Sequence, residues 1–152
     1  MSTTEKLEFF ELGDKTALIC ADNRITEIAT QTLREFSFKF HTAETPELAL
    51  ERIRYTSYNC IVLHENFAGS TLRSNAVLNV LALLPMSQRR TSFICLVGPS
   101  LRTLDAMQAF VHSVQLVVNP SDLPNFGPIV KKGLAEFEGL YRVYNQTVAE
   151  FT

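Results

Sequence analysis

The amino-acid sequence predicts an α/β fold in which helices cover both faces of a parallel sheet. Short apolar segments recur along the chain, and they alternate with segments whose apolar residues have helical spacing. The run 60–63 has four consecutive apolar residues between polar flanks, which is typical of a strand buried on both faces. Alternating elements of this length indicate parallel strands that are joined by right-handed crossovers.

The elements are expected in a regular order along the chain. Asp22 is a suitable cap for the first helix, and Thr45 with Pro46 opens the second. Residues 87–91 are expected to form an exposed connector, and Asp122 lies in a predicted turn before the last helix. The expected strands are 16–20, 38–41, 60–63, 92–97 and 114–118, and the expected helices are 24–36, 45–55, 76–84, 101–111 and 129–150.

Length and charge favour one globular domain. We expect an N-terminal extension over residues 1–15 and a single domain over residues 16–152. The net charge of −2 gives no general attraction to nucleic acid or to an anionic membrane. The sequence lacks an apolar run of about 18 residues and a signal-peptide pattern. We therefore expect neither a nucleic-acid partner nor a membrane partner.

The cysteines also limit the classes of protein. There are three of them, they form no CxxC pair, and all lie inside apolar runs. Such residues are typically reduced members of a core rather than disulfides or zinc ligands. The sequence therefore predicts a cytoplasmic protein without a metal site.

His64 follows the central strand, where functional side chains collect in parallel sheets. Histidine can accept a phosphoryl group, bind a metal or titrate near neutral pH. Glu65 would point to the other side of the strand, and Cys60 lies about 13 Å away along it, too far for a catalytic pair. We expect His64 to be a hydrogen-bonded structural histidine, with the ligand or switch role left open.

From residue 16 to about residue 140 the sequence resembles the receiver domain of bacterial response regulators. The resemblance depends on the order of the elements, on Asp22-Asn23 after the first strand, on the strand 58–63 and on Asn119-Pro120 after the fifth strand. It implies a flavodoxin-like, doubly wound sheet of five strands in the order 2-1-3-4-5. It also implies a role in two-component signal transduction.

The resemblance places a phosphoacceptor pocket at the strand ends, and the sequence departs from the receiver pattern there. Receivers carry paired acids that hold magnesium, an aspartate that accepts the phosphoryl group, a threonine or serine after strand four and a lysine after strand five. The matching residues here are Ala21, Asp22, His64, Val97 and Asn119. Of these chemical groups, the acid of Asp22 alone is retained.

These departures predict a module that is not an enzyme. Phosphoryl transfer relies on positioned charges and on a cation held by oxygen ligands, and loss of one such group commonly costs about 10²–10³-fold in rate. We expect a pseudo-receiver without a cofactor, which binds an unidentified signalling protein independently of phosphorylation. Two alternatives stay open: a phospho-switch that uses His64 or Asp22, and a domain that senses a small molecule.

The last helix has a heptad seam that extends beyond a normal receiver. Its apolar residues follow one another at spacings of 4, 3, 4, 3, 4 and 3, and they are Val130, Leu134, Phe137, Tyr141, Tyr144, Val148 and Phe151. This seam packs on its own domain, on a second copy in a homodimer, or on another protein. Receivers commonly bind partners through the surface formed by their fourth and fifth helices and their fifth strand. This surface and the end of the seam together give the candidates for partner binding, which are Met107, Phe110, Tyr141, Tyr144, Val148 and Phe151.

Overall fold

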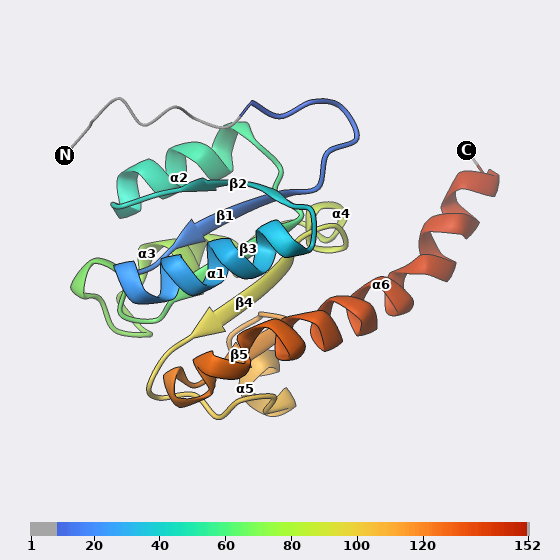
Figure 1. Cartoon of the computed structure of the whole chain (residues 1–152). Helices are drawn as coiled ribbons and strands as arrows, with labels where there is room; N and C mark the ends of the chain where they lie inside the picture. The colour runs from blue at the N-terminus through green and yellow to red at the C-terminus, as the bar shows by residue number, and fades with distance from the viewer. Residues whose placement is uncertain (1–8, 152) are drawn as a thin grey trace.

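A computed structural model describes residues 9–151, apart from the side chains at positions 143, 145, 149 and 151. It contains a five-stranded parallel sheet in the order β2-β1-β3-β4-β5 with helices on both faces (Figure 1). The predicted fold class and strand order are therefore confirmed. The predicted extension at 1–15 lies partly outside the described residues, and its boundary at residue 15 stays a prediction.

The elements alternate along the chain as expected. The strands are β1 (Thr16–Cys20), β2 (Lys39–Thr42), β3 (Cys60–His64), β4 (Phe93–Val97) and β5 (Leu116–Val118). The helices are α1 (Asn23–Glu35), α2 (Pro46–Tyr55), α3 (Ala76–Leu81), α4 (Met86–Arg89), α5 (Ala106–Val111) and α6 (Phe126–Phe151). Two 3₁₀ segments, η1 (Phe67–Gly69) and η2 (Pro120–Asn125), join the larger elements.

The sheet separates two hydrophobic layers. Successive strand residues point to opposite faces, so Leu18 and Leu63 pack with α2, α3 and α5, whereas Ile19 and Val62 pack with α1 and α6. All residues of β1 and β4 are buried. Because the central strands are covered on both sides, their apolar runs appear continuous in the sequence.

The close approach of α6 to the sheet depends on Gly133. A Cβ atom at this position would lie 2.8 Å from Cζ of Phe93, a buried ring of β4. Phe93 also packs edge-on against Phe137, with 5.6 Å between the ring centroids. The absent side chain of Gly133 thus allows the first half of α6 to lie directly on β4, and the second half continues past the sheet (Figure 1).

The predicted helix starts are confirmed where capping residues supply them. The Asp22 carboxylate accepts a hydrogen bond from the Ile25 backbone amide at 3.0 Å, and the Thr45 hydroxyl accepts one from Leu48 at 3.2 Å. These side chains satisfy backbone donors that the first turn of a helix leaves unpaired.

Several predicted boundaries are wrong. The helix expected over 76–84 ends at Leu81, and the strand expected over 114–118 begins at Leu116. The helix expected over 101–111 is shortened to α5, because Leu104 has a φ of 66° and Asp105 caps the helix after it. The connector expected over 87–91 overlaps the short helix α4, which begins at Met86. The last helix starts at Phe126 rather than near residue 129, and Pro128 fits its first turn because no intrahelical donor is needed there. 

Asn75 fixes the chain as it leaves β3. Its side chain is buried and donates to the carbonyl oxygens of His64 at 3.0 Å and Glu65 at 3.2 Å. The Asn75 amide oxygen accepts from the Leu78 backbone amide at 3.1 Å and thereby caps α3. One side chain therefore joins the end of the central strand to the start of a helix.

We expect Asn75→Ala to lower the free energy of unfolding by about 2–4 kcal/mol, because a helix cap is lost and buried carbonyl groups lose their donor. Urea denaturation monitored by circular dichroism measures this change. Asn79→Ala is the matched control, since Asn79 is exposed and donates only to the Arg73 carbonyl. Equal effects of the two substitutions would contradict this role of Asn75.

The cysteines are free and buried, as the sequence predicts. Burial disfavours the thiolate and raises the pKa of the Cys20 and Cys60 thiols to about 12, from an ordinary value of 9.0. Burial also raises the pKa of Cys95 well above that value. Between pH 9 and 12, therefore, these thiols stay protonated in the native state while they ionise in the unfolded chain.

We expect stability to be independent of these thiols below pH 9 and to fall as pH rises above it, by up to about 1.4 kcal/mol per pH unit for each thiol. Stability falls with rising pH because the unfolded state binds fewer protons than the native state in this range. Urea midpoints between pH 8 and 10.5 measure the slope. Cys60→Ala should have a shallower slope than the unsubstituted chain, and identical slopes would contradict the assignment.

Candidate functional site

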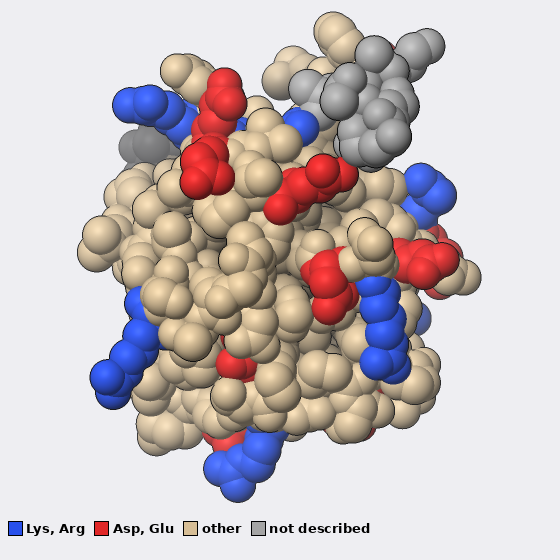
Figure 2. Space-filling model, turned by 90° about the vertical axis from the view of Figure 1, so that its left-hand side faces the viewer, with Lys and Arg blue, Asp and Glu red and all other residues tan. Residues whose placement is uncertain are grey.

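A shallow cleft lies at the carboxyl ends of β1 and β3. Its walls come from the turn after β1, the segment before α2 and the loop after β3, and the charged or titratable residues in the lining are Asp22, Glu44 and His64. Figure 2 views this side of the molecule, where Lys and Arg side chains lie mostly around the margin and several Asp and Glu side chains lie nearer the centre. The sheet thus brings two predicted site residues, Asp22 and His64, to one place.

Asp22 and His64 face each other across the cleft. The distance from His64 Nδ1 to Asp22 Oδ2 is 3.9 Å, and the two side chains are 14% and 56% exposed. The other oxygen of Asp22 accepts the capping hydrogen bond of α1. Asp22 therefore combines a structural hydrogen bond with a weak, partly solvated contact to the imidazole.

Of the other three predicted pocket residues, one lies in this cleft and two do not line it. Ala21 lies in its wall, but Val97 is fully buried in the layer against α1 and α6. The Asn119 amide nitrogen donates to the Leu101 carbonyl at 2.8 Å, and its amide oxygen accepts from the Ser121 backbone amide at 2.9 Å. Asn119 thus fixes the loops that follow β4 and β5.

Glu65 makes a buried contact that the sequence analysis did not identify. Its carboxylate accepts hydrogen bonds from the Ser100 backbone amide at 2.8 Å and from the Ser100 hydroxyl at 2.9 Å. A Cβ atom on Gly98 would lie 1.9 Å from Glu65 Oε1, so the carboxylate occupies the space that this glycine leaves open. As predicted, Glu65 points away from His64, and it ties the loops after β3 and β4 together.

The described residues lack a group of three or more His, Cys, Asp or Glu side chains that could hold a metal ion. Hard cations such as magnesium need several oxygen ligands. Asp22 and the exposed Glu44 are the carboxylates of the cleft, because Glu65 is directed to Ser100. What the cleft offers chemically is one imidazole beside two solvated acids.

Between residues 9 and 151, the structure has no helix of the length and apolar character that membrane crossing requires.

A second surface lies where α5, β5 and α6 meet. Met107 and Phe110 on α5 are 69% and 80% exposed, and Leu140 on α6 is 69% exposed. Leu104 and Leu140 line a groove whose floor is formed by β5, the edge strand of the sheet. Leu104, Val111 and Leu140 are further exposed apolar residues that the sequence analysis did not select, because helical spacing alone does not distinguish a buried face from an exposed one.

The candidates on α6 have different surroundings. Tyr141 packs on Phe137 with 5.1 Å between ring centroids, and the Arg90 guanidinium lies 4.2 Å from the centroid of Tyr144. Val148 is partly exposed, and the side chain of Phe151 lies outside the described part of the chain.

Comparison with solved structures places this arrangement among known folds. A protein assigned as a response regulator in Chloroflexus aurantiacus superposes with a TM-score of 0.62 at 16% identity, covering 80% of this chain and 98% of the other. A CheY-like receiver domain from Methylobacillus flagellatus gives a TM-score of 0.55 at 17% identity, covering 79% and 98%. The chain has the receiver-domain fold. A response regulator from Hahella chejuensis gives 0.56 at 18% identity, covering 82% and 93%.

No protein-family model matches the chain, and no curated protein matches it. The receiver-domain fold is thus shown by the arrangement of the backbone. The chemistry of the strand ends depends on the residues described above.

We expect Gly98→Ala to destabilise the protein by about 1–3 kcal/mol, because the new methyl group would displace the buried Glu65 carboxylate. Gly139→Ala is the control, since no atom lies within 4 Å of the added Cβ and alanine favours the helix by up to about 1 kcal/mol. Thermal and urea denaturation measure both changes. A Gly98→Ala protein as stable as the unsubstituted chain would contradict the close contact with Glu65.

Proposed function

We propose that this chain is a pseudo-receiver, a non-catalytic signalling module that acts by binding a partner protein. The observation that carries this proposal is the exposed apolar surface formed by Met107 and Phe110 of α5, by Leu104 before α5 and by Leu140 of α6. Met107 and Phe110 lie on α5, and Leu104 and Leu140 line the groove beside it. Exposed apolar patches commonly mark sites of protein–protein interaction. We refer to these four residues as the α5–α6 surface.

The charge of the α5–α6 surface fits a protein partner. The groove between α5 and α6 is lined mainly by apolar and uncharged residues, with Asp105 and Glu136 as its acids. Asp105 is held by the Gln108 backbone amide and by Arg102 at 3.0 Å, so it belongs to the structure of α5. An apolar centre with charged residues at its rim is the usual anatomy of a protein interface.

The strand ends support action without phosphorylation. His64 stands where receivers carry the phosphoacceptor aspartate, and one oxygen of Asp22 is used as a helix cap. Val97 supplies no hydroxyl, and the Asn119 amide is bonded to the loop after β4. The described residues that line the cleft include no lysine or arginine, and preorganised positive charges of this kind dominate phosphoryl transfer.

We expect incubation with acetyl phosphate and Mg²⁺ to leave the mass of the intact protein unchanged, because the cleft lacks the charge that stabilises the transfer. Intact mass spectrometry at neutral pH gives the result directly. Because phosphohistidine is acid-labile, the spectrum is recorded under native conditions. An added phosphoryl group on His64 or Asp22 would favour the phospho-switch instead.

We expect Phe110→Asp to abolish capture of a partner from a lysate of the source cells, because a charge would replace the most exposed apolar side chain of the α5–α6 surface. Leu83→Asp is the matched control, since Leu83 is equally exposed but follows α3. A protein captured by the unsubstituted chain and by Leu83→Asp, but not by Phe110→Asp, supports the proposal. Capture that is equal with all three baits would refute it.

A further inference from the structure

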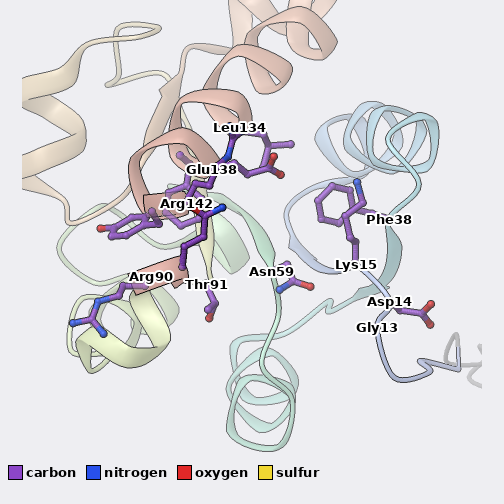
Figure 3. Close-up of a pocket in the computed structure, with 13 residues that line it drawn as sticks. Gly13, Asp14, Lys15, Phe38, Asn59, Arg90, Thr91, Leu134, Glu138 and Arg142 are labelled. Carbon is purple, nitrogen blue, oxygen red and sulfur yellow. The ribbon is translucent and has the colours of Figure 1, made fainter. Parts of the chain in front are cut away.

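A groove lies beside α6 at the amino ends of the strands. It separates α6 from the segments that lead into β1, β2, β3 and β4, and its volume is about 580 Å³. Pockets that bind small molecules commonly have volumes of about 300–1,000 Å³. Figure 3 shows Phe38 and Lys15 on one side of the groove and Leu134 and Glu138 of α6 on the other, with Asn59 between them. We call it the amino-end groove.

The amino-end groove has aromatic side chains on two sides. Phe38 comes from the segment before β2, and Phe137 and Tyr141 come from α6. Phe137 and Tyr141 pack edge to face with 5.1 Å between their ring centroids, which fixes the positions of both rings. Leu134 completes the apolar lining. A ligand with a ring system would therefore find apolar contacts on both sides of the groove.

The charged residues of the groove leave an excess of positive charge. Asp14 is paired at 3.0 Å with Lys39, which does not line the groove. The other charged residues of the lining are one acid and three cations, namely Glu138, Lys15, Arg90 and Arg142. Within the described part of the chain, no ion pair joins any of these cations to a carboxylate. Since the single acid offsets at most one cation, the groove favours an anion.

Asn59 adds a hydrogen-bond donor whose orientation is fixed. Its amide oxygen accepts hydrogen bonds from the Thr16 backbone amide at 3.0 Å and from the Thr16 hydroxyl at 3.3 Å. The amide nitrogen thus points away from Thr16, and Figure 3 shows it on the side of Thr91. Among the residues that the structure describes, this nitrogen has no acceptor. An anionic oxygen in the groove would accept from it and would also lie near the cations.

We propose that the amino-end groove binds a small aromatic anion, which is a soluble molecule with a ring system and one anionic group. The rings lie against Phe137 and Tyr141, and the anionic group lies between Asn59 and the cations Lys15 and Arg142. A neutral apolar ligand would leave the cations and the amide nitrogen unused, whereas inorganic phosphate would leave the aromatic lining uncovered. This site goes beyond the proposed function and uses none of the four residues of the α5–α6 surface.

The fluorescence of anilinonaphthalene sulfonate, an aromatic anion, measures binding to the full chain. We expect saturable binding whose dissociation constant rises by a factor of about ten or more in Lys15→Met/Arg142→Met, because charge-assisted contacts are lost. Lys131→Met/Lys132→Met is the matched control, since it removes the same charge from exposed positions outside the groove and should bind as the unsubstituted chain does. No saturable binding, or equal effects of the two double variants, would overturn the proposal.

The neutral dye N-phenylnaphthylamine separates the charge of the groove from its shape. It has the same rings without the sulfonate, so we expect it to bind the unsubstituted chain and Lys15→Met/Arg142→Met with equal affinity. Circular dichroism verifies that the variants are folded. If the double variant lost both dyes to the same extent, the proposed role of the two cations would be wrong.

Nuclear Overhauser contacts to labelled leucine methyl groups locate the bound sulfonate dye. We expect contacts from its ring protons to Leu134, which lines the amino-end groove. Contacts to Leu104 and Leu140 instead would place the dye on the α5–α6 surface and would overturn the site. The capture experiment with Phe110→Asp does not involve the amino-end groove, so this proposal and the proposed function can fail separately.

Discussion

Burial of the central strands on both faces is the constraint on which the rest of the structure depends. Within β1, β3 and β4 every backbone donor and acceptor must pair with a neighbouring strand, and nearly every side chain must be apolar. Polar side chains therefore begin only at the strand ends, with His64 and Glu65 after β3. This constraint confines the polar chemistry of the sheet to the ends of its strands.

The same constraint explains how much the sequence could predict. A strand such as Cys60–His64 is recognised from its apolar run, and Asp22 is recognised as a cap because a polar residue follows a strand and precedes helical spacing. The shortened helix α5 was missed because Leu101 and Leu104 have helical spacing while the backbone at Leu104 is left-handed. Leu101 is buried although it lies before the helix α5 and not within it. Spacing records which side chains are apolar, but it does not record the backbone conformation that buries them.

The candidate site was predicted in part for a similar reason. The meeting of Asp22 and His64 follows from the order of the strands, since parallel strands in this order bring their carboxyl ends together. The pairing of Glu65 with Ser100 could not be predicted, because the residues are 35 positions apart and each alone is an ordinary polar residue. A lone glutamate directly after a buried strand, combined with a glycine at the end of the next strand, is the signal that points to such a contact.

The contact of Gly133 with Phe93 has a mechanical consequence. It holds α6 against β4 near the start of the helix, while α6 continues for 18 further residues to Phe151, or roughly 27 Å. A rotation of the helix by about 10° around this fulcrum would carry the far end through roughly 5 Å, whereas the atoms at Gly133 would hardly move. A small displacement at Gly133 would therefore be enlarged at the far end of α6, unless the contacts of Phe137 with Phe93 and of Tyr144 with Arg90 opposed it.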